Sequence, residues 1–151
     1  MRGEIMKEQK KTHTGAYALI LNEDKIVLIK KARGGYKGKL DLPGGGIEHI
    51  ETPLEAVIRE CQEEAGVNIE NSKLFIVCSN TFKWQMTPNI IENLHHLGIL
   101  YTAECNNQVL KNDADGLDSF GAEWYAINDL QKDQLSPFAY QGLIALGYKI
   151  D

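Results

Sequence analysis

The segment from Pro43 to Gly66 constrains the fold of this chain more than any other. It contains three consecutive glycines, followed by a stretch that carries both start and stop signals for a helix. Thr52 can serve as the N-cap, and Pro53 suits the first helical position. Glu55 stands three residues after Thr52, as a capping box requires. Since Gly66 supplies a stop signal, the sequence predicts a helix that begins after Thr52 and ends before Gly66.

This helix carries two unlike faces. Five apolar side chains share one stripe, at ~3.6 residues per turn: Leu54, Val57, Ile58, Cys61 and Ala65. The stripe is the face expected to dock on a sheet. Glu60, Glu63 and Glu64 project roughly 120° from its centre, so we expect the acidic face to stay outside the core. Like charges at this spacing repel one another unless a cation lies between them.

A divalent cation would suit the acidic face. Mg²⁺ prefers hard oxygen ligands and completes its shell with water and substrate phosphates, whereas zinc would recruit histidine or cysteine. The plain alternative is a glutamate-rich surface helix, which is common in soluble proteins. The preceding PGGG, residues 43–46, is predicted to be a turn whose glycines let the backbone approach a ligand closely. This context favours the metal site over the plain surface helix.

The other elements are mostly strands. Strand-like runs occupy residues 13–21, 25–30, 40–42, 73–80, 94–104 and 121–127, and short helices are predicted over 128–135 and 137–146. The first two runs read as a hairpin, and residues 81–93 as a polar loop. Because strands outnumber helices and do not alternate strictly with them, the pattern favours an α+β fold, an α/β/α sandwich in which helices flank a mixed β-sheet.

Length and charge limit the organisation and the partners. At 151 residues we expect one domain over residues 12–151, preceded by a flexible N-terminal segment, 1–11. The net charge of −5 argues against a nucleic-acid polymer as partner. No apolar run is long enough for a bilayer or a secretory signal, so we expect no membrane partner and a cytoplasmic location. The three separated cysteines suit reduced thiols better than a zinc site or disulfides.

A cation-rich segment lies just before the glycines. Its members fall within ten positions: Lys30, Lys31, Arg33, Lys37 and Lys39. Beside a carboxylate cluster, such a segment could hold a small phosphorylated molecule together with a metal ion. Its plain interpretation is a solvated loop.

The glycines and the helix together resemble the signature box of the Nudix hydrolases. Gly45 is followed by five residues and Glu51, then by seven residues and Arg59-Glu60-Cys61-Gln62-Glu63-Glu64-Ala65-Gly66-Val67. Every fixed charged and glycine position of that box is met. Two positions depart from the usual pattern: Cys61 replaces an aliphatic residue, and Ile50 stands where many members have glycine, so the turn before Glu51 is expected to be shaped differently.

The resemblance implies a role for each matching residue. Glu60, Glu63 and Glu64 would bind the catalytic Mg²⁺ or Mn²⁺, with the carbonyl of Gly44 as a further ligand. Arg59 would pair with Glu51 in a structural role. The alternative for Arg59 is an i,i+4 pair with Glu55.

Three residues outside the helix complete the implied site. Lys31, with its neighbour Arg33, would contact a substrate phosphate. Asp118 would be a loop carboxylate that adds a metal ligand or a base. The proton of the attacking water would pass to Glu60, or alternatively to Glu63 or Asp118.

The implied reaction is metal-dependent hydrolysis of a nucleoside diphosphate linked to another group. The chain lacks the sequence patterns that family members acting on ADP-ribose or coenzyme A often carry. The leading candidate substrate is therefore a nucleoside triphosphate or a related small nucleotide. A Nudix-fold sensor that binds a nucleotide without cleaving it is the alternative. Assembly into a homodimer is compatible with either function.

Two further groups of residues are candidates for contacts in a substrate pocket. His95 and His96 must face opposite sides of a strand. Phe82 and Trp84 could either stack on a nucleobase or pack in the protein.

Overall fold

The computed structural model describes residues 5–106, 109–111 and 119–151. Within these residues, seven strands form one sheet: β1 Lys7–Asn22, β2 Lys25–Lys31, β3 Leu40–Asp41, β4 Gly44–Gly46, β5 Glu70–Thr87, β6 Ile90–Glu104 and β7 Ser119–Ala126. The helical elements of the same residues are α1 Pro53–Ala65, the 3-10 turns η1 Ile127–Asp129 and η2 Lys132–Gln134, and α2 Pro137–Ala145. No helix in this part of the chain is long and apolar enough to cross a membrane.

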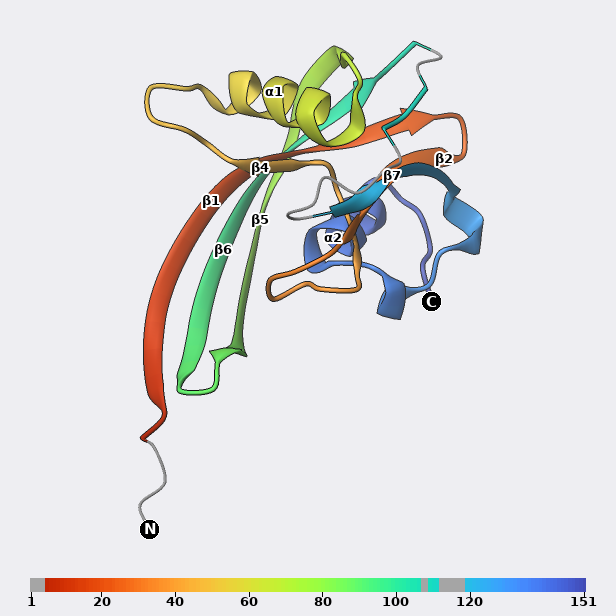
Figure 1. Cartoon of the computed structure of the whole chain (residues 1–151). Coiled ribbons are helices and arrows are strands. Elements are labelled where there is room, and N and C mark those ends of the chain that lie inside the picture. Colours follow the sequence, from red (N-terminus) through yellow and green to blue (C-terminus); the bar gives the residue numbers. More distant parts are fainter. Residues whose placement is uncertain (1–4, 107–108, 112–118) are drawn as a thin grey trace.

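The sheet is organised around β1. This strand pairs in parallel with β6 from Lys7 to Ile20, and on its other side it pairs with β4 at Gly15–Tyr17 and with β2 at Leu21–Asn22. The strand order is β3-β2-β1-β6-β5, with β7 beside β2. Figure 1 shows that β1, β6 and β5 extend past the helices as a curved arm. The predicted mixed sheet and the predicted β1–β2 hairpin are thus confirmed.

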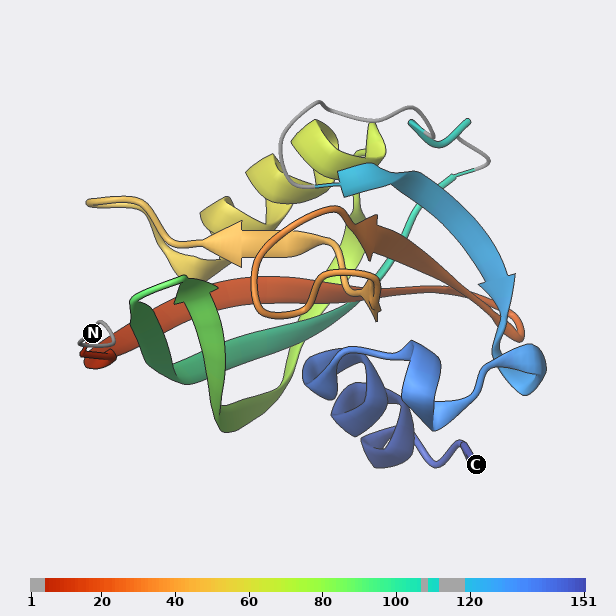
Figure 2. The ribbon, with the colours of Figure 1, turned by 60° about the horizontal axis from the view of Figure 1, so that its bottom comes forward.

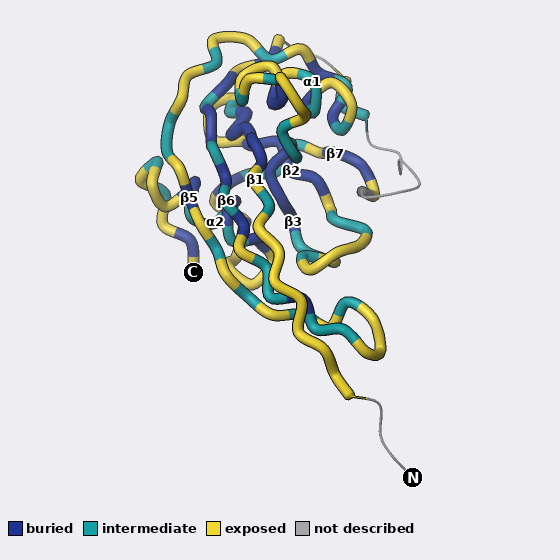
Figure 3. Tube along the Cα trace, turned by 90° about the vertical axis from the view of Figure 1, so that its left-hand side faces the viewer, coloured by how far each residue is buried: buried dark blue, intermediate teal, exposed yellow. Residues whose placement is uncertain are grey.

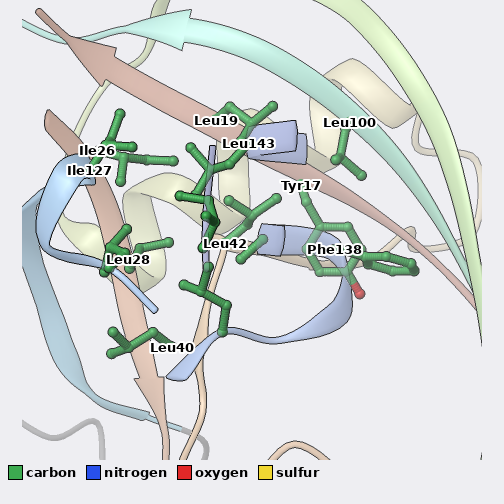
Figure 4. Close-up of a cluster of buried hydrophobic side chains, with 14 of the residues drawn as sticks. Tyr17, Leu19, Ile26, Leu28, Leu40, Leu42, Leu100, Ile127, Phe138 and Leu143 are labelled. Atoms are coloured by element: carbon green, nitrogen blue, oxygen red, sulfur yellow. The ribbon is translucent and has the colours of Figure 1, made fainter. Parts of the chain in front are cut away.

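Helices cover both faces of the sheet, α1 on one side and α2 on the other, as Figures 1 and 2 show. Successive residues of β1 therefore enter different cores: Tyr17 and Leu19 face α2, whereas Ala18 and Ile20 face α1. A strand buried on both faces reads as a continuous apolar run. Figure 4 shows the core beneath α2, where Phe138 packs on Tyr17 with ring centroids 5.5 Å apart. The predicted α/β/α sandwich is confirmed.

Helix α1 has the boundaries that its caps predict. The Thr52 hydroxyl accepts a hydrogen bond from the N–H of Glu55, and the Glu55 carboxylate accepts one from the N–H of Thr52. Gly66 ends the helix in the left-handed conformation, with φ of 68°. The predicted apolar stripe is partly wrong, because Leu54 and Ile58 are 39% and 43% exposed. The buried side chains of α1 are Ala56, Val57, Cys61 and Ala65.

The docked face of α1 is therefore rotated from the predicted one. At ~100° per residue, the buried set is centred between Val57 and Cys61, and Glu64 and Glu60 lie on the side of this face. These two glutamates are half-buried and belong to neither core, so the prediction that the acidic face stays outside the core holds only in part. The side chain of Glu60 is 17% exposed, whereas that of Glu63 is 59% exposed. The reason lies in β4, whose three glycines have no side chains and leave room for carboxylates between α1 and the sheet.

Two predicted loops are strands in the structure. Residues 81–93 continue β5 and β6 into one long hairpin, which turns between Thr87 and Ile90. Their alternation of polar and larger side chains is the period-2 pattern of a strand with one solvated face. The glycine turn at residues 43–46 is also wrong: Gly44–Gly46 form β4 and pair with β1. Glycine has little preference for strands, so pairing with β1, and not local propensity, decides this element.

The remaining expectations are met in part. Strand β7 and helix α2 lie where residues 121–127 and 137–146 predict them, but residues 128–135 form two 3-10 turns instead of one helix. Residues 7–11, predicted to belong to a flexible segment, lie in β1 and pair with β6. Figure 3 shows this part of β1 as an exposed arm. The polar sequence there signals exposure, and it does not exclude strand pairing.

Candidate active site

A cleft of about 1040 Å³ gathers most of the predicted site residues. The Glu60, Glu63 and Glu64 carboxylates and the Gly44–Gly46 backbone line one part of it. Cationic side chains of Lys11, Lys31, Arg33 and Lys111 contribute to its walls. Aromatic and polar side chains of the long strands line the rest. Asp118, the predicted loop carboxylate, lies outside the described residues.

Two glycines of β4 allow the sheet to approach α1. The N–H of Gly44 donates to Oε1 of Glu64 at 2.9 Å. With φ of 147°, Gly44 has a backbone that other residues rarely adopt, and a Cβ there would collide with the carbonyl oxygen of Ala16. A Cβ on Gly45 would lie 2.8 Å from both Cδ and Oε1 of Glu60. Position 44 must therefore be glycine because a side chain would clash with the backbone of β1. Position 45 must be glycine because a side chain would clash with the carboxylate of Glu60.

Arg59 joins the loop, β4 and the helix, as its predicted structural role requires. Its Nε and Nη2 donate to the two carboxylate oxygens of Glu51 at 2.8 and 2.9 Å. Nη2 also donates to the carbonyl of Gly46 at 3.1 Å, and Nη1 donates to Glu60 at 2.9 Å. These Arg59 hydrogen bonds lower the pKa of Glu51 to about 2. The alternative pair with Glu55 is not formed, since the Glu55 carboxylate completes the capping box.

The two carboxylates between α1 and β4, Glu60 and Glu64, are half-buried in the wall of the cleft. Burial raises the pKa of Glu64 to about 8, although the N–H of Gly44 and the charge of Lys31 oppose the shift. Burial also raises the pKa of Glu60, against the hydrogen bond from Arg59, and the two carboxylates disfavour each other's charge. A pair of this kind takes up a proton or a cation to reduce its charge.

The donor set fits a hard divalent cation. Three carboxylates and the carbonyls of β4 supply oxygen ligands, which Mg²⁺ prefers. In the part of the chain that the structure describes, no three histidine, cysteine or acidic side chains already converge on one point. Nη1 of Arg59 holds Glu60 at 2.9 Å and Glu63 at 3.3 Å, while Gly44 holds Glu64. Binding an ion would therefore require these carboxylates to turn away from their present donors.

Three cations stand near the carboxylates. Lys31 ends β2 and lines the cleft together with Arg33, and their predicted contact with a substrate phosphate stays a prediction. Lys111 also lines the cleft, and its Nζ donates to the carbonyl of Glu63 at 3.3 Å. The sequence analysis missed Lys111, because a single lysine far from the box carries no local signal.

Asp41 is a further buried carboxyl group in the wall of the cleft. It is 5% exposed, and its Oδ1 accepts hydrogen bonds from the Ser136 hydroxyl at 2.6 Å and from the N–H of Leu42 at 2.8 Å. Burial raises its pKa. Ser136 is also the N-cap of α2. Asp41 thus ties α2 to the short strand β3 that precedes β4.

The long strands form a second part of the cleft around His96. The ring of His96 lies between two tyrosines: the Tyr17 hydroxyl is 2.6 Å from Nε2, and the Tyr36 hydroxyl is 2.9 Å from Nδ1. A neutral imidazole satisfies both contacts, because one nitrogen donates and the other accepts. Burial lowers the pKa of His96 to about 4. His95 is exposed, so the two histidines face opposite sides as predicted.

Aromatic rings surround His96. Tyr36 stacks on His96 at 5.6 Å and on Phe82 at 5.1 Å between ring centroids. Of the two predicted aromatic candidates, Trp84 lines the cleft, whereas Phe82 packs against Tyr36. The sequence analysis missed Tyr36 and Glu92. Strand alternation within residues 81–93 was the signal that could have indicated Glu92.

Comparison with known proteins identifies the family. The NUDIX domain model matches residues 11–146. An ADP-ribose pyrophosphatase of Methanocaldococcus jannaschii is 33% identical over 114 residues, which cover 76% of this chain and 62% of that protein. An 8-oxo-dGTP diphosphatase of Escherichia coli is 42% identical over 62 residues, which cover 40% of this chain and 48% of that protein. The chain thus spans less than two thirds of the length of these relatives.

Solved structures share the fold. The MutT NUDIX hydrolase from Burkholderia pseudomallei matches with a TM-score of 0.72 at 24% identity, over 90% of this chain and 98% of that chain. The NUDIX domain of Shewanella oneidensis NrtR, complexed with ADP ribose, matches with a TM-score of 0.63 at 15% identity, over 97% and 88% of the two chains. With a family match over residues 11–146 and this architecture, the chain belongs to the Nudix hydrolase family.

Proposed function

We propose that this protein is a divalent-metal-dependent hydrolase that cleaves the phosphoanhydride bond of a nucleoside diphosphate linked to another group. The observation that carries the proposal is the composition of the cleft, where three carboxylates of α1 stand beside Lys31, Arg33 and Lys111. Carboxylates suit the cation, and the lysines and the arginine suit the phosphates that the cation would bridge.

The metal site would use the box residues. Glu60, Glu63 and Glu64 would hold Mg²⁺, or Mn²⁺ in its place, with the carbonyl of Gly44 as a further ligand. The bound cation would neutralise charge on the phosphate oxygens and lower the pKa of the attacking water. Glu60 takes the proton from that water, with Glu63 as the alternative base. The role of Asp118 as a ligand or base stays a prediction.

Other residues position the substrate and the base. Lys31 and Arg33 contact the phosphates and offset their charge. Arg59, through Glu51 and the carbonyl of Gly46, keeps Glu60 against β4. Gly45 permits that close approach, because any side chain there would occupy the place of the Glu60 carboxylate.

A nucleoside triphosphate or a related small nucleotide is the proposed substrate. The names of the relatives, an ADP-ribose pyrophosphatase and an 8-oxo-dGTP diphosphatase, support a substrate that contains a nucleoside diphosphate. We place the protein in the cytoplasm as a single domain over residues 12–151 that acts on a small molecule, as a monomer or a homodimer, without a nucleic-acid polymer or a membrane as partner.

A nucleotide sensor that does not cleave its ligand is the second candidate. One observation favours it: the described acidic side chains do not yet converge on a single cation position. The likeness to a NUDIX domain solved with ADP ribose is compatible with either function. The complete set of box carboxylates favours the enzyme, because a sensor has no need of all three.

A nucleotide panel tests the proposal. With Mg²⁺, the purified protein should release phosphate or pyrophosphate from at least one nucleotide, and Glu63→Gln should reduce that rate by roughly 10³-fold. Glu104→Gln is the control, since Glu104 is exposed on β6 and outside the cleft. A silent panel with both Mg²⁺ and Mn²⁺, together with tight nucleotide binding, would favour the sensor.

A further inference from the structure

The part of the cleft formed by the long strands contains an acidic residue that the proposed reaction does not use. Side chains alternate along β6, so Glu92, Leu94 and His96 all face the cleft. Trp84 of β5 stands directly opposite Glu92 in the strand register and also lines the cleft. Glu92 thus lies in the part of the cleft that the long strands form, away from the carboxylates of α1.

Glu92 is a buried carboxylate with one donor. It is 6% exposed, and its Oε1 accepts a hydrogen bond from Nε1 of Trp84 at 2.9 Å. Among the described residues, the Glu92 side chain has no other hydrogen bond and no lysine or arginine within ion-pair distance, although His13 lies near enough to feel its charge. No fully buried side-chain oxygen of these residues lacks a partner, so Oε2 keeps some contact with solvent, on a residue that lines the cleft. A buried charge with so few donors favours a ligand that brings more.

The surroundings of Glu92 suit a flat ligand. Residues 32–39 pack on the aromatic side chains of β5, since a Cβ on Gly35 would collide with Cζ of Phe82 and would lie 3.4 Å from Cδ1 of Trp84. Tyr36 of the same loop stacks on Phe82. Tyr36, Trp84 and His96 line the cleft on this side, so a planar aromatic group that enters it meets rings on which it can stack.

The distance from the carboxylates of α1 suits an elongated ligand. Gly45 pairs with Ala16 of β1, whereas Glu92 pairs with Gln9, seven residues further along the same strand. At ~3.3 Å per residue this is about 23 Å along the strand, before its curvature brings the ends closer (Figure 1). Both places line the same cleft, so a ligand that uses both would carry its phosphates at one end and a planar polar group at the other, as a nucleotide does.

We propose that Glu92, oriented by Trp84, recognises the nucleobase of the substrate and selects guanine over adenine. This inference rests on the proposed function for the identity of the ligand as a nucleotide. Guanine presents adjacent N1–H and N2–H donors, which match the two oxygens of a carboxylate. Adenine presents one N–H donor beside the N1 lone pair, which a carboxylate oxygen would repel. Oε1 can accept the second donor together with Trp84, since each carboxylate oxygen has two acceptor positions.

The test compares GTP with ATP in the full chain with Mg²⁺. Wild-type kcat/KM should favour GTP by at least ~10-fold, and Glu92→Gln should reduce the GTP/ATP ratio by about 10- to 100-fold. The amide still accepts from Trp84 and keeps the shape of the side chain, but it turns a donor toward the base. Glu104→Gln on the same strand is the matched control and should leave the ratio unchanged.

A binding measurement separates this inference from the proposed reaction. In a Trp124→Phe background, Trp84 is the remaining tryptophan, and its fluorescence should change on addition of GDP at concentrations at least ~10-fold lower than for ADP. If no nucleotide is hydrolysed but GDP is preferred in this assay, the proposed reaction fails and the role of Glu92 stands. If nucleotides are hydrolysed and the GTP/ATP ratio is the same in wild type and Glu92→Gln, or if ATP is preferred, the role of Glu92 is overturned.

Discussion

The two ends of the cleft differ in how the chain builds them. The acidic end comes from one continuous segment, Gly44 to Glu64, and half-buries two carboxylates, whose raised pKa values mark a cost in stability. The aromatic end is assembled from a loop and two distant strands, and its tyrosines and His96 satisfy one another by hydrogen bonds. Charge that a reaction needs is thus concentrated on a short rigid segment, whereas recognition surfaces come from long-range pairing.

Removing a buried carboxyl group should separate activity from stability at the acidic end. Glu64→Gln should lower the hydrolysis rate by roughly 10³-fold, because a proposed cation ligand is lost. The metal-free variant should nevertheless be more stable than wild type by about 2 kcal/mol at pH 7, because folded wild type must protonate Glu64, whose pKa is about 8, whereas the unfolded chain ionises it, and Gln still accepts from Gly44. Kinetics and urea unfolding in EDTA measure the two effects. If Glu64→Gln lowered the free energy of unfolding as well as the hydrolysis rate, the claim that the acidic end places charge at a cost in stability would be contradicted.

Substitution of Gly44 and of Gly45 in β4 should have two different effects, one on stability and one on activity. Gly44→Ala meets the backbone of Ala16 and should lower the free energy of unfolding by about 3 kcal/mol. The atoms nearest to a Cβ at Gly45 all belong to the Glu60 side chain, which can move, so Gly45→Ala should fold but lose activity by roughly 10²-fold. Thermal unfolding and steady-state kinetics distinguish the two. Gly34→Ala, with no atom within 4 Å of the added Cβ, controls for the loss of a left-handed glycine.

The aromatic end should control the acid sensitivity of the fold. Burial lowers the pKa of His96 from 6.5 to about 4. Between these pH values the unfolded chain binds a proton that the folded protein excludes, so this contribution is complete above pH ~6.5 and is lost as the pH falls toward 4. We expect a loss of about 2 kcal/mol by pH 4.5. His96→Asn should flatten urea-unfolding profiles between pH 4.5 and 7.5, whereas exposed His95→Asn should match wild type.

The smallest effect concerns the turn that precedes Glu51. Ile50 has φ of 63° and is 91% exposed, so a β-branched residue adopts a left-handed conformation without burying its side chain. Ile50→Gly should raise the free energy of unfolding by about 0.5–1 kcal/mol, because relief of strain exceeds the entropy that glycine loses on folding. Ile50→Ala retains the Cβ and should gain less. A glycine variant that melts below wild type would remove this explanation.

The sequence predicts the acidic end well because its signals are local. The capping box of α1 and the pair between Arg59 and Glu51 join residues a few positions apart. The rotation of α1 toward Glu64 was missed, because it depends on β4, and a run of glycines does not reveal which neighbour it pairs with. A helical wheel assigns the buried face of a helix from the polarity of its own side chains. It cannot predict that α1 packs beside a strand made of glycines, which leaves room for carboxylates.

The aromatic end could not be assembled in the same way. Tyr36, Trp84 and His96 meet only through the register of β5 with β6 and through the fold of residues 32–39. Register is set by long-range pairing and burial of one face, and the polar composition of residues 81–93 predicts a loop. Their polar residues face either solvent or the cleft, so polarity indicated function there and not a loop.

Dependence of turnover on a divalent cation tests the central claim most directly. The best substrate of the nucleotide panel should be hydrolysed by protein supplied with Mg²⁺, should not be hydrolysed after treatment with excess EDTA, and should be hydrolysed again when Mg²⁺ or Mn²⁺ is restored. Undiminished turnover in EDTA would contradict a metal site built on Glu60, Glu63 and Glu64.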